Sequence, residues 1–160
     1  MAWMNSDGLY IKFGTEEATV TPAGEYNQLG PLHYVEADIN WDELEAFGTD
    51  TILSETLRIP TGVFLESASF EVIVAFTSGG SATLSFGTID TDRTTEHDLD
   101  GIDATIALTS IDAIGDTITC DGTKIDTVLT NSTPMLLTAT VGTADFTAGR
   151  GFLRVYYRHI

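Results

Sequence analysis

The chain has 160 residues, with 24 acidic and seven basic side chains and a formal net charge of -17. A negative field of this size repels phosphate backbones and anionic lipid surfaces, so binding to nucleic acid or to an anionic membrane is disfavoured. A single cysteine excludes an internal disulfide framework. The N-terminus has no basic and apolar leader, and no apolar run approaches the ~20 residues of a membrane-spanning helix. We therefore expect a protein that is neither exported by a signal peptide nor embedded in a membrane.

The length favours one structural domain made of two segments. Residues 1–50 are expected to form an N-terminal arm with the first strands, and residues 51–160 the main β-sandwich. The arm includes a turn-rich stretch at 22–31, with two prolines and two glycines. Such a stretch lies over the surface of its own domain or over a neighbouring subunit, and the sequence leaves both open.

Three short runs in the arm alternate apolar and other residues, and they predict strands at 9–13, 19–21 and 33–39. Residues 41–47 follow an asparagine suited to an N-cap, carry a glutamate at the third helical position and end before a glycine. This pattern predicts a helical turn.

The centre of the chain predicts a β-hairpin. Apolar residues alternate with others at 69–76 and again at 82–87, and the turn 77–81 contains a glycine pair that suits a tight reversal. The second face of 69–76 is partly apolar, which predicts a strand covered on both sides. A strand over 51–59 ends at a proline–glycine turn and is expected to lie beside the hairpin.

The last third of the chain contains further strand patterns. Apolar residues at helical spacing predict one short helix within 102–111, although its β-branched residues favour a strand. Strong strands are predicted at 135–141 and 152–157, and weaker ones at 117–120 and 125–129. Short strands at spacings of about 8–12 residues indicate an all-β fold, an antiparallel β-sandwich or jelly roll with an extended N-terminal arm and one short helix.

The stretch 90–103 concentrates acidic side chains in one expected loop. Carboxylate oxygens are the ligands that calcium prefers, so Asp90, Asp92, Asp98 and Asp100 are candidate ligands. Their order supplies only a fragment of an EF-hand loop, and an arginine among them offers neutralisation without a metal. The simpler interpretation is a solvated loop, so we expect no cofactor and keep calcium as the one candidate.

The common motif-based routes to catalysis are missing from the sequence: the nucleophile elbow, the HExxH zinc motif, the phosphate-binding loop and the dinucleotide fingerprint. His33, His97 and His159 are far apart in the chain, and none has a His or Cys neighbour at metal-ligand spacing. Cys120 has an acidic neighbour, Asp121, which raises a thiol pKa and makes a nucleophile unexpected. We therefore expect that the protein is not an enzyme.

Turn-and-strand patterns run along nearly the whole chain. The most distinctive are found at 9–15, 23–26, 59–62, 77–84, 87–90 and 141–158. In these patterns the chain resembles virion structural proteins of tailed bacteriophages, namely capsid-associated proteins of the decoration or cement type. The resemblance implies a β-sandwich that binds the outside of the capsid lattice, often as a trimer, and stiffens the shell against the pressure of internal DNA.

The resemblance also implies the partners and the location. The partners would be the major capsid protein and further copies of the chain, and the location would be the capsid exterior of a virion assembled in the host bacterial cytoplasm. Tyr and Arg are enriched at protein interfaces. Contacts are accordingly expected at six residues: Tyr26, His33, Tyr34, Arg154, Tyr156 and Arg158.

Other interpretations remain open at this stage. The aromatic residues of the last strand could simply line a solvated sheet face. A receptor-binding or glycan-binding module of a fibre or tail would use the same sandwich with exposed Trp or Tyr, and Trp3 and Trp41 are the only tryptophans. A connector or other tail component would form rings in solution without a capsid. A hydrolase of the β-sandwich type is the least favoured, because no motif supports it.

Overall fold

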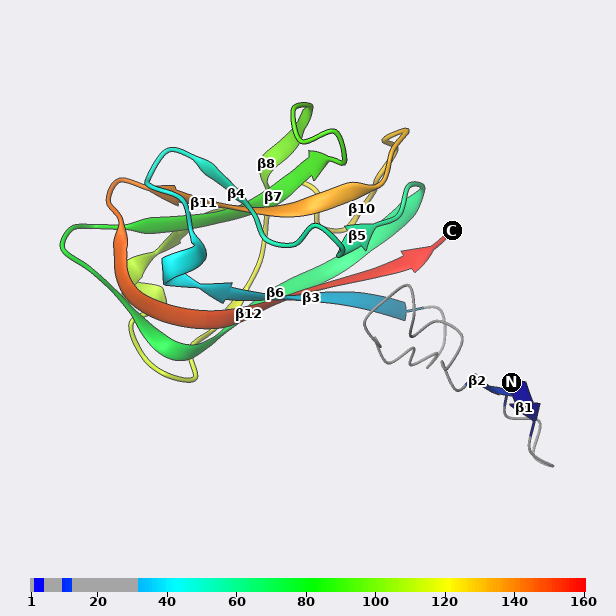
Figure 1. Cartoon of the computed structure of the whole chain (residues 1–160), viewed down its shortest axis with the longest axis horizontal. Coiled ribbons are helices and arrows are strands. Elements are labelled where there is room, and N and C mark those ends of the chain that lie inside the picture. The colour runs from blue at the N-terminus through cyan, green and yellow to red at the C-terminus, as the bar shows by residue number, and fades with distance from the viewer. Residues whose placement is uncertain (1, 5–9, 13–31) are drawn as a thin grey trace.

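The computed structural model describes residues 2–4, 10–12 and 32–160. Two five-stranded antiparallel sheets pack face to face and enclose one hydrophobic core (Figure 1). The predicted all-β antiparallel sandwich is therefore confirmed. No helix in the described part of the chain is long and apolar enough to cross a membrane.

The first sheet is built around the two long strands β6 and β12, which pair with each other over most of their length. Strand β12 has β3 on its other side, and β3 forms an edge of the sheet. The other side of β6 pairs with two short strands, β9 and β10. The bounds are β3 (Leu32–Asn40), β6 (Val63–Ser78), β9 (Thr117–Thr119), β10 (Thr127–Val128) and β12 (Phe146–His159).

The second sheet has the order β4-β11-β7-β8, and β5 also pairs with β11. Its bounds are β4 (Asp50–Ile52), β5 (Arg58–Ile59), β7 (Thr83–Asp90), β8 (Glu96–Ala107) and β11 (Met135–Gly142). Two short strands, β1 (Ala2–Met4) and β2 (Tyr10–Lys12), pair with each other. The helical content among the described residues consists of two 3-10 turns, η1 (Trp41–Glu43) and η2 (Leu108–Ser110).

Four phenylalanines join the two sheets in the core. Phe70 of β6 lies with its ring centroid 5.1 Å from that of Phe86 on β7 and 5.8 Å from that of Phe76. Phe76 meets Phe146 edge to face at 5.2 Å. Phe70, Phe76 and Phe86 are fully buried, and tilted ring pairs of this kind add stability beyond their buried area.

The predicted hairpin is wrong, although the turn near Gly79 and Gly80 is present. The strands before and after this turn, β6 and β7, lie in different sheets and do not pair. Both sides of β6 are already taken, by β12 on one side and by β9 and β10 on the other, which leaves no place for β7. The turn therefore carries the chain from one layer of the sandwich to the other.

The expectation of a strand covered on both sides is also wrong. Ile73 and Val74 on β6 are 37% and 47% exposed. The register with β12 shifts at this point, because Val74 is opposite Arg150 whereas Val72 is opposite Gly151. A bulge of this kind turns two consecutive side chains outward.

Two further predictions need correction. The short helix within 102–111 is largely strand, because residues up to Ala107 belong to β8 and only the turn η2 is helical. The strand over 51–59 is two short strands, β4 and β5, which pair with β11 and not with β6. The helical turn at 41–47 begins at Trp41 as expected but spans only three residues.

The remaining strand predictions are mostly confirmed. Those at 33–39, 135–141 and 152–157 fall within β3, β11 and β12, and the weaker ones correspond to β9 and to a shorter β10. The run 9–13 contains β2. The predictions for 19–21 and 22–31 lie outside the described residues.

Candidate interaction surface

Strand β12 presents three arginines on the outer face of the first sheet, the face that points away from the core. Side chains alternate along a strand, so Arg150, Arg154 and the next arginine four residues on share one side. Leu153 and Val155, between them, are fully buried. Strand β12 therefore has a core side and an outer side.

Arg154 lies at the centre of this face and binds carboxylates on both neighbouring strands. Its Nε donates to Glu36 of β3 at 2.5 Å, and its Nη1 donates to Glu71 of β6 at 2.7 Å. These hydrogen bonds raise the pKa of the Arg154 guanidinium above its usual value, and the bond to Glu36 has the larger effect, followed by the bond to Glu71. One side chain thus ties three strands together.

Arg150 makes a two-pronged pair with Asp38 on β3. Nε and Nη2 donate to the two carboxylate oxygens at 3.0 and 2.6 Å. The hydrogen bonds from Arg150 lower the pKa of Asp38 against the opposing effect of burial. The guanidinium also lies 5.8 Å from the centre of the Phe152 ring.

Arg158 completes the row near the end of the strand. Its Nε lies 3.1 Å from a carboxylate oxygen of Glu66, an ion pair without hydrogen-bond geometry. The guanidinium lies 4.5 Å from the centre of the Phe64 ring, within the range of a cation–π contact.

Two tyrosines lie on the same outer face. Tyr34 of β3 is directly opposite Tyr156 of β12, and their ring centroids are 5.9 Å apart. Tyr34 is 58% exposed. We call this surface the arginine face, and it consists of Tyr34, Glu36, Asp38, Phe64, Glu66, Glu71, Arg150, Phe152, Arg154, Tyr156 and Arg158.

The structure brings together four of the six predicted contact residues: Tyr34, Arg154, Tyr156 and Arg158. His33 is on the opposite side of β3, where its ring stacks on that of Tyr157 at 5.5 Å and meets the ring of His159 at 5.2 Å. Tyr26 lies outside the described residues.

Sequence reasoning missed the carboxylates that accompany the arginines. Glu36 and Asp38 could have been found, since the alternation in β3 places them on the side of Tyr34. Glu66 and Glu71 could not have been found in this way. In a regular strand an even-numbered and an odd-numbered residue point to opposite faces. They share a face only because a bulge in β6 shifts the register between Tyr156 and Tyr157 of β12.

The acidic stretch 90–103 is not one loop, since β8 begins at Glu96. Asp92 accepts hydrogen bonds within its own turn, chiefly from the Thr95 hydroxyl at 2.6 Å, and they lower its pKa to about 2. Asp90 lies beside His97, with 3.8 Å between Oδ1 and Nε2. These two carboxylates therefore serve separate local contacts.

The other two calcium candidates form a pair with each other. A hydrogen bond that the protonated Asp100 carboxyl donates to Asp98 raises the pKa of Asp100. For Asp98, burial favours a higher pKa, but hydrogen bonds with Asp100 and Thr123 and the charge of Lys124 outweigh it and lower the pKa. Among the described residues, no three His, Cys, Asp or Glu side chains are grouped as metal ligands.

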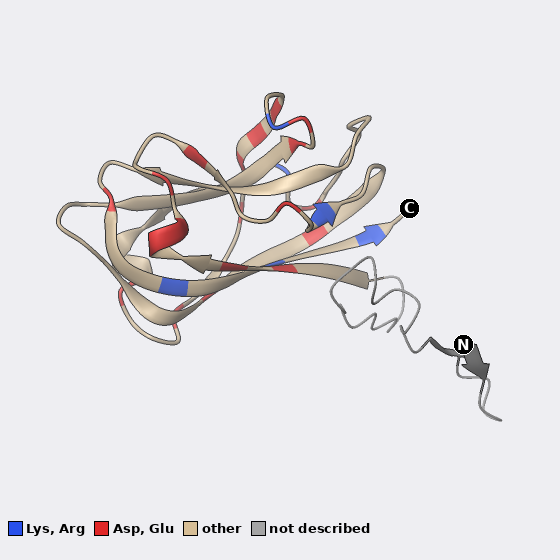
Figure 2. Cartoon of the chain, viewed as in Figure 1, with Lys and Arg blue, Asp and Glu red and all other residues tan. Residues whose placement is uncertain are grey.

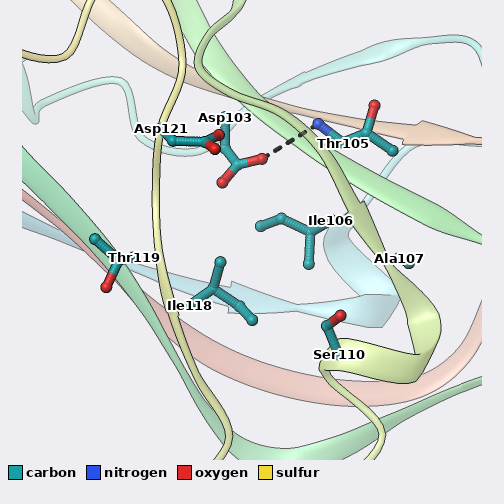
Figure 3. A pocket seen from close by; sticks show the side chains of 8 residues that line it. All are labelled: Asp103, Thr105, Ile106, Ala107, Ser110, Ile118, Thr119 and Asp121. Atoms are coloured by element: carbon teal, nitrogen blue, oxygen red, sulfur yellow. Dashed lines mark hydrogen bonds between the residues drawn. The ribbon is translucent and has the colours of Figure 1, made fainter.

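A shallow hollow of about 230 Å³ opens between β8 and β9. Figure 3 shows Asp103 and Asp121 on one side of the hollow, with Ile106 and Ile118 nearby. Asp103 is almost fully buried and accepts a hydrogen bond from the Thr105 amide at 3.2 Å. Burial raises the pKa of Asp103 against the effect of the Thr105 hydrogen bond, and the negative charge of Asp121 acts in the same direction as burial. The ionisable side chains among the eight lining residues are the two carboxylates, Asp103 and Asp121.

Cys120 is 2% exposed, and burial together with the Asp103 carboxylate raises its pKa to about 12. The direction of this shift agrees with the expectation from its acidic neighbour. A thiol that remains protonated is a poor nucleophile.

Comparison with known structures places this fold among chains from bacteriophage capsids. A chain of the acid-stable capsid of Helicobacter pylori bacteriophage KHP30 matches with a TM-score of 0.55 and 19% identity, over 81% of this chain and 88% of that one. A chain of the cyanophage Pam1 capsid asymmetric unit matches at 0.56 with 12% identity, over 93% and 100%. A chain of the capsid of Ralstonia phage GP4 matches at 0.58 with 15% identity, over 88% and 91%.

At these identities the likeness is one of fold. The expected resemblance to phage capsid proteins is confirmed at that level. No protein-family model matches the chain, and no curated protein matches its sequence.

Proposed function

We propose that the chain is a non-enzymatic structural protein of a bacteriophage virion, which binds the outer surface of the capsid shell and stabilises it as a decoration or cement protein. The observation that carries this proposal is the fold, since three phage capsid structures each contain a chain that matches it over more than four-fifths of its length. A fold does not by itself define a function, so the surface must supply the rest of the argument.

The arginine face is suited to protein contacts. It combines exposed Tyr34 with arginines, the residue types that are enriched at interfaces. Acidic residues are spread over both sheets and the loops, whereas basic residues occur at few positions (Figure 2). An acidic outward surface would keep a dense array of copies soluble on the shell.

The partners in this proposal are the major capsid protein and further copies of the chain, with a trimer as the favoured assembly. The site of action is the capsid exterior of the virion.

The deciding experiment mixes the purified protein with capsids that lack it and images the particles by cryo-electron microscopy. Regular density at symmetry-related positions on the outside of the shell is the expected result. Capsids that remain bare at saturating protein would contradict the proposal. A ring or fibre of the protein alone would then support a connector or tail component, and binding to a glycan array would support a receptor-binding module.

A further inference from the structure

The charge of the molecule is unevenly distributed between the arginine face and the rest. Residues 32–160 contain 20 acidic and six basic side chains. Four of the acids and three of the bases lie on the arginine face, as three ion-paired arginines with four carboxylates. The rest of residues 32–160 therefore contains sixteen acidic side chains and only three basic ones. The arginine face is therefore close to neutral, whereas the rest of the described surface repels an acidic partner.

The charges on this face are arranged in stripes that follow the strands. Strand β3 carries Glu36 and Asp38, β12 carries the arginines, and β6 carries Glu66 and Glu71. The order across the sheet is thus negative, positive, negative. A second copy that packs against this face with a displacement of one strand, about 4.8 Å, places its carboxylate stripe over the arginine stripe. The face is complementary to itself.

The arginines retain donors for such a contact. Arg150 and Arg154 each use two of the five N–H groups of a guanidinium in the hydrogen bonds described above. The paired side chains on this face are 32–47% exposed, so they can reach a partner. Tyr34 adds an aromatic contact beside them.

We infer that the arginine face is the contact between two copies of this chain. This rests on and deepens the proposed function, in which further copies of the chain are partners, but the contact itself concerns the protein alone. With a displacement of one strand, two strand widths overlap along the nine-residue length of β3, about 30 by 10 Å or roughly 300 Å². A stable complex buries about 800 Å² per partner, so the contact is weak and forms at high local concentration.

The test measures self-association by sedimentation equilibrium, with the full chain from about 10 μM to about 1 mM, a range suited to a weak complex. Tyr34→Glu adds a negative charge to the exposed tyrosine pair of the arginine face. Phe47→Glu is the matched control, because Phe47 is 57% exposed and lies outside the arginine face. Circular dichroism melts establish that both variants fold.

We expect the wild type and Phe47→Glu to associate and Tyr34→Glu to remain monomeric. A wild type that stays monomeric over the whole range overturns the inference, and so does a Tyr34→Glu variant that associates normally. If a monomeric protein still decorates capsids, the copy contact is wrong and the proposed function stands. If the protein associates through this face but leaves capsids bare, the proposed function is wrong and the copy contact stands.

Discussion

Arg154 is the residue on which the outer face of the first sheet most depends, because it bridges β3 and β6 from β12. Replacing it by methionine keeps the aliphatic length but leaves Glu36 and Glu71 without their shared cation. The side chains are 32–38% exposed, so solvent screens much of the interaction. We expect the free energy of unfolding to fall by about 1 kcal/mol, measured by urea denaturation.

The control for this change is Arg93→Met. Arg93 pairs with one carboxylate, Glu55, and both side chains are more than half exposed. An isolated surface pair of this kind contributes less than about 0.5 kcal/mol. Equal losses in the two variants would show that the bridge across three strands adds nothing to a simple surface pair.

Cys120 tests how well the core excludes solvent, because its thiol is buried. Its thiol pKa of about 12 means that almost no thiolate forms near neutral pH, so a thiol reagent should modify the native protein only through unfolding. The unfolded thiol has a pKa of 9.0 and loses its proton first. Its contribution to stability is therefore complete below pH 9 and falls as the pH rises toward 12. The prediction on labelling would be contradicted if the folded protein at pH 8 were labelled stoichiometrically and as rapidly as the protein unfolded in denaturant.

Among the elements, sequence patterns predicted strands well and their partners poorly. Alternation identifies β3 and β12 because it reports which side of a strand is buried. It contains no information on which strand lies alongside. The turn at Gly79 and Gly80 fits a hairpin, yet β7 joins the other sheet, since β12, β9 and β10 occupy both sides of β6. That outcome depends on β12, whose residues pair with β6 residues that are 68 to 96 positions away, from Phe146–Ser78 to His159–Val63.

The same limit applies to the candidate surface. Alternation along the strand places Tyr156 on the same face as Arg154 and Arg158, and the structure agrees. His33 and Tyr34 were both expected to make contacts, but adjacent residues of a strand point to opposite sides, so only one of them lies on the arginine face. The carboxylates of β6 required a bulge, and bulges leave little trace in an amino-acid pattern.

Gly149 connects this irregular geometry to the core. It adopts a φ of +139°, and a Cβ at this position would lie 2.2 Å from the Phe76 ring. Because Phe76 is fully buried, Gly149→Ala should lower the free energy of unfolding by about 3 kcal/mol or more. Gly115→Ala is the control, with a φ of +88° and no atom within 4 Å of the added group. Gly115→Ala should lower the free energy of unfolding by about 1 kcal/mol, measured by urea denaturation. Similar values for both would mean that the Phe76 ring moves aside easily.

At the scale of the whole molecule, two electrostatic effects oppose each other. The ion pairs of the arginine face stabilise the first sheet, and each is screened because it is partly exposed. The sixteen acids elsewhere in 32–160 repel one another over longer distances and destabilise the compact state. The balance decides how stability responds to salt.

Repulsion should dominate, since the excess of acids is much larger than the number of ion pairs. At 0.1 M salt the Debye length is about 10 Å, so added salt weakens interactions between distant charges more than contacts at 2.5–3.1 Å. We therefore expect the Tm to rise by a few degrees between roughly 20 mM and 300 mM NaCl, at a protein concentration low enough to exclude self-association. KCl should give the same increase, because screening depends on ionic strength and not on the cation. A Tm that falls with salt would mean that the ion pairs of the arginine face contribute more to stability than the acidic surface removes. A rise with NaCl or KCl that is far exceeded by a small amount of CaCl2 would instead indicate specific binding of calcium.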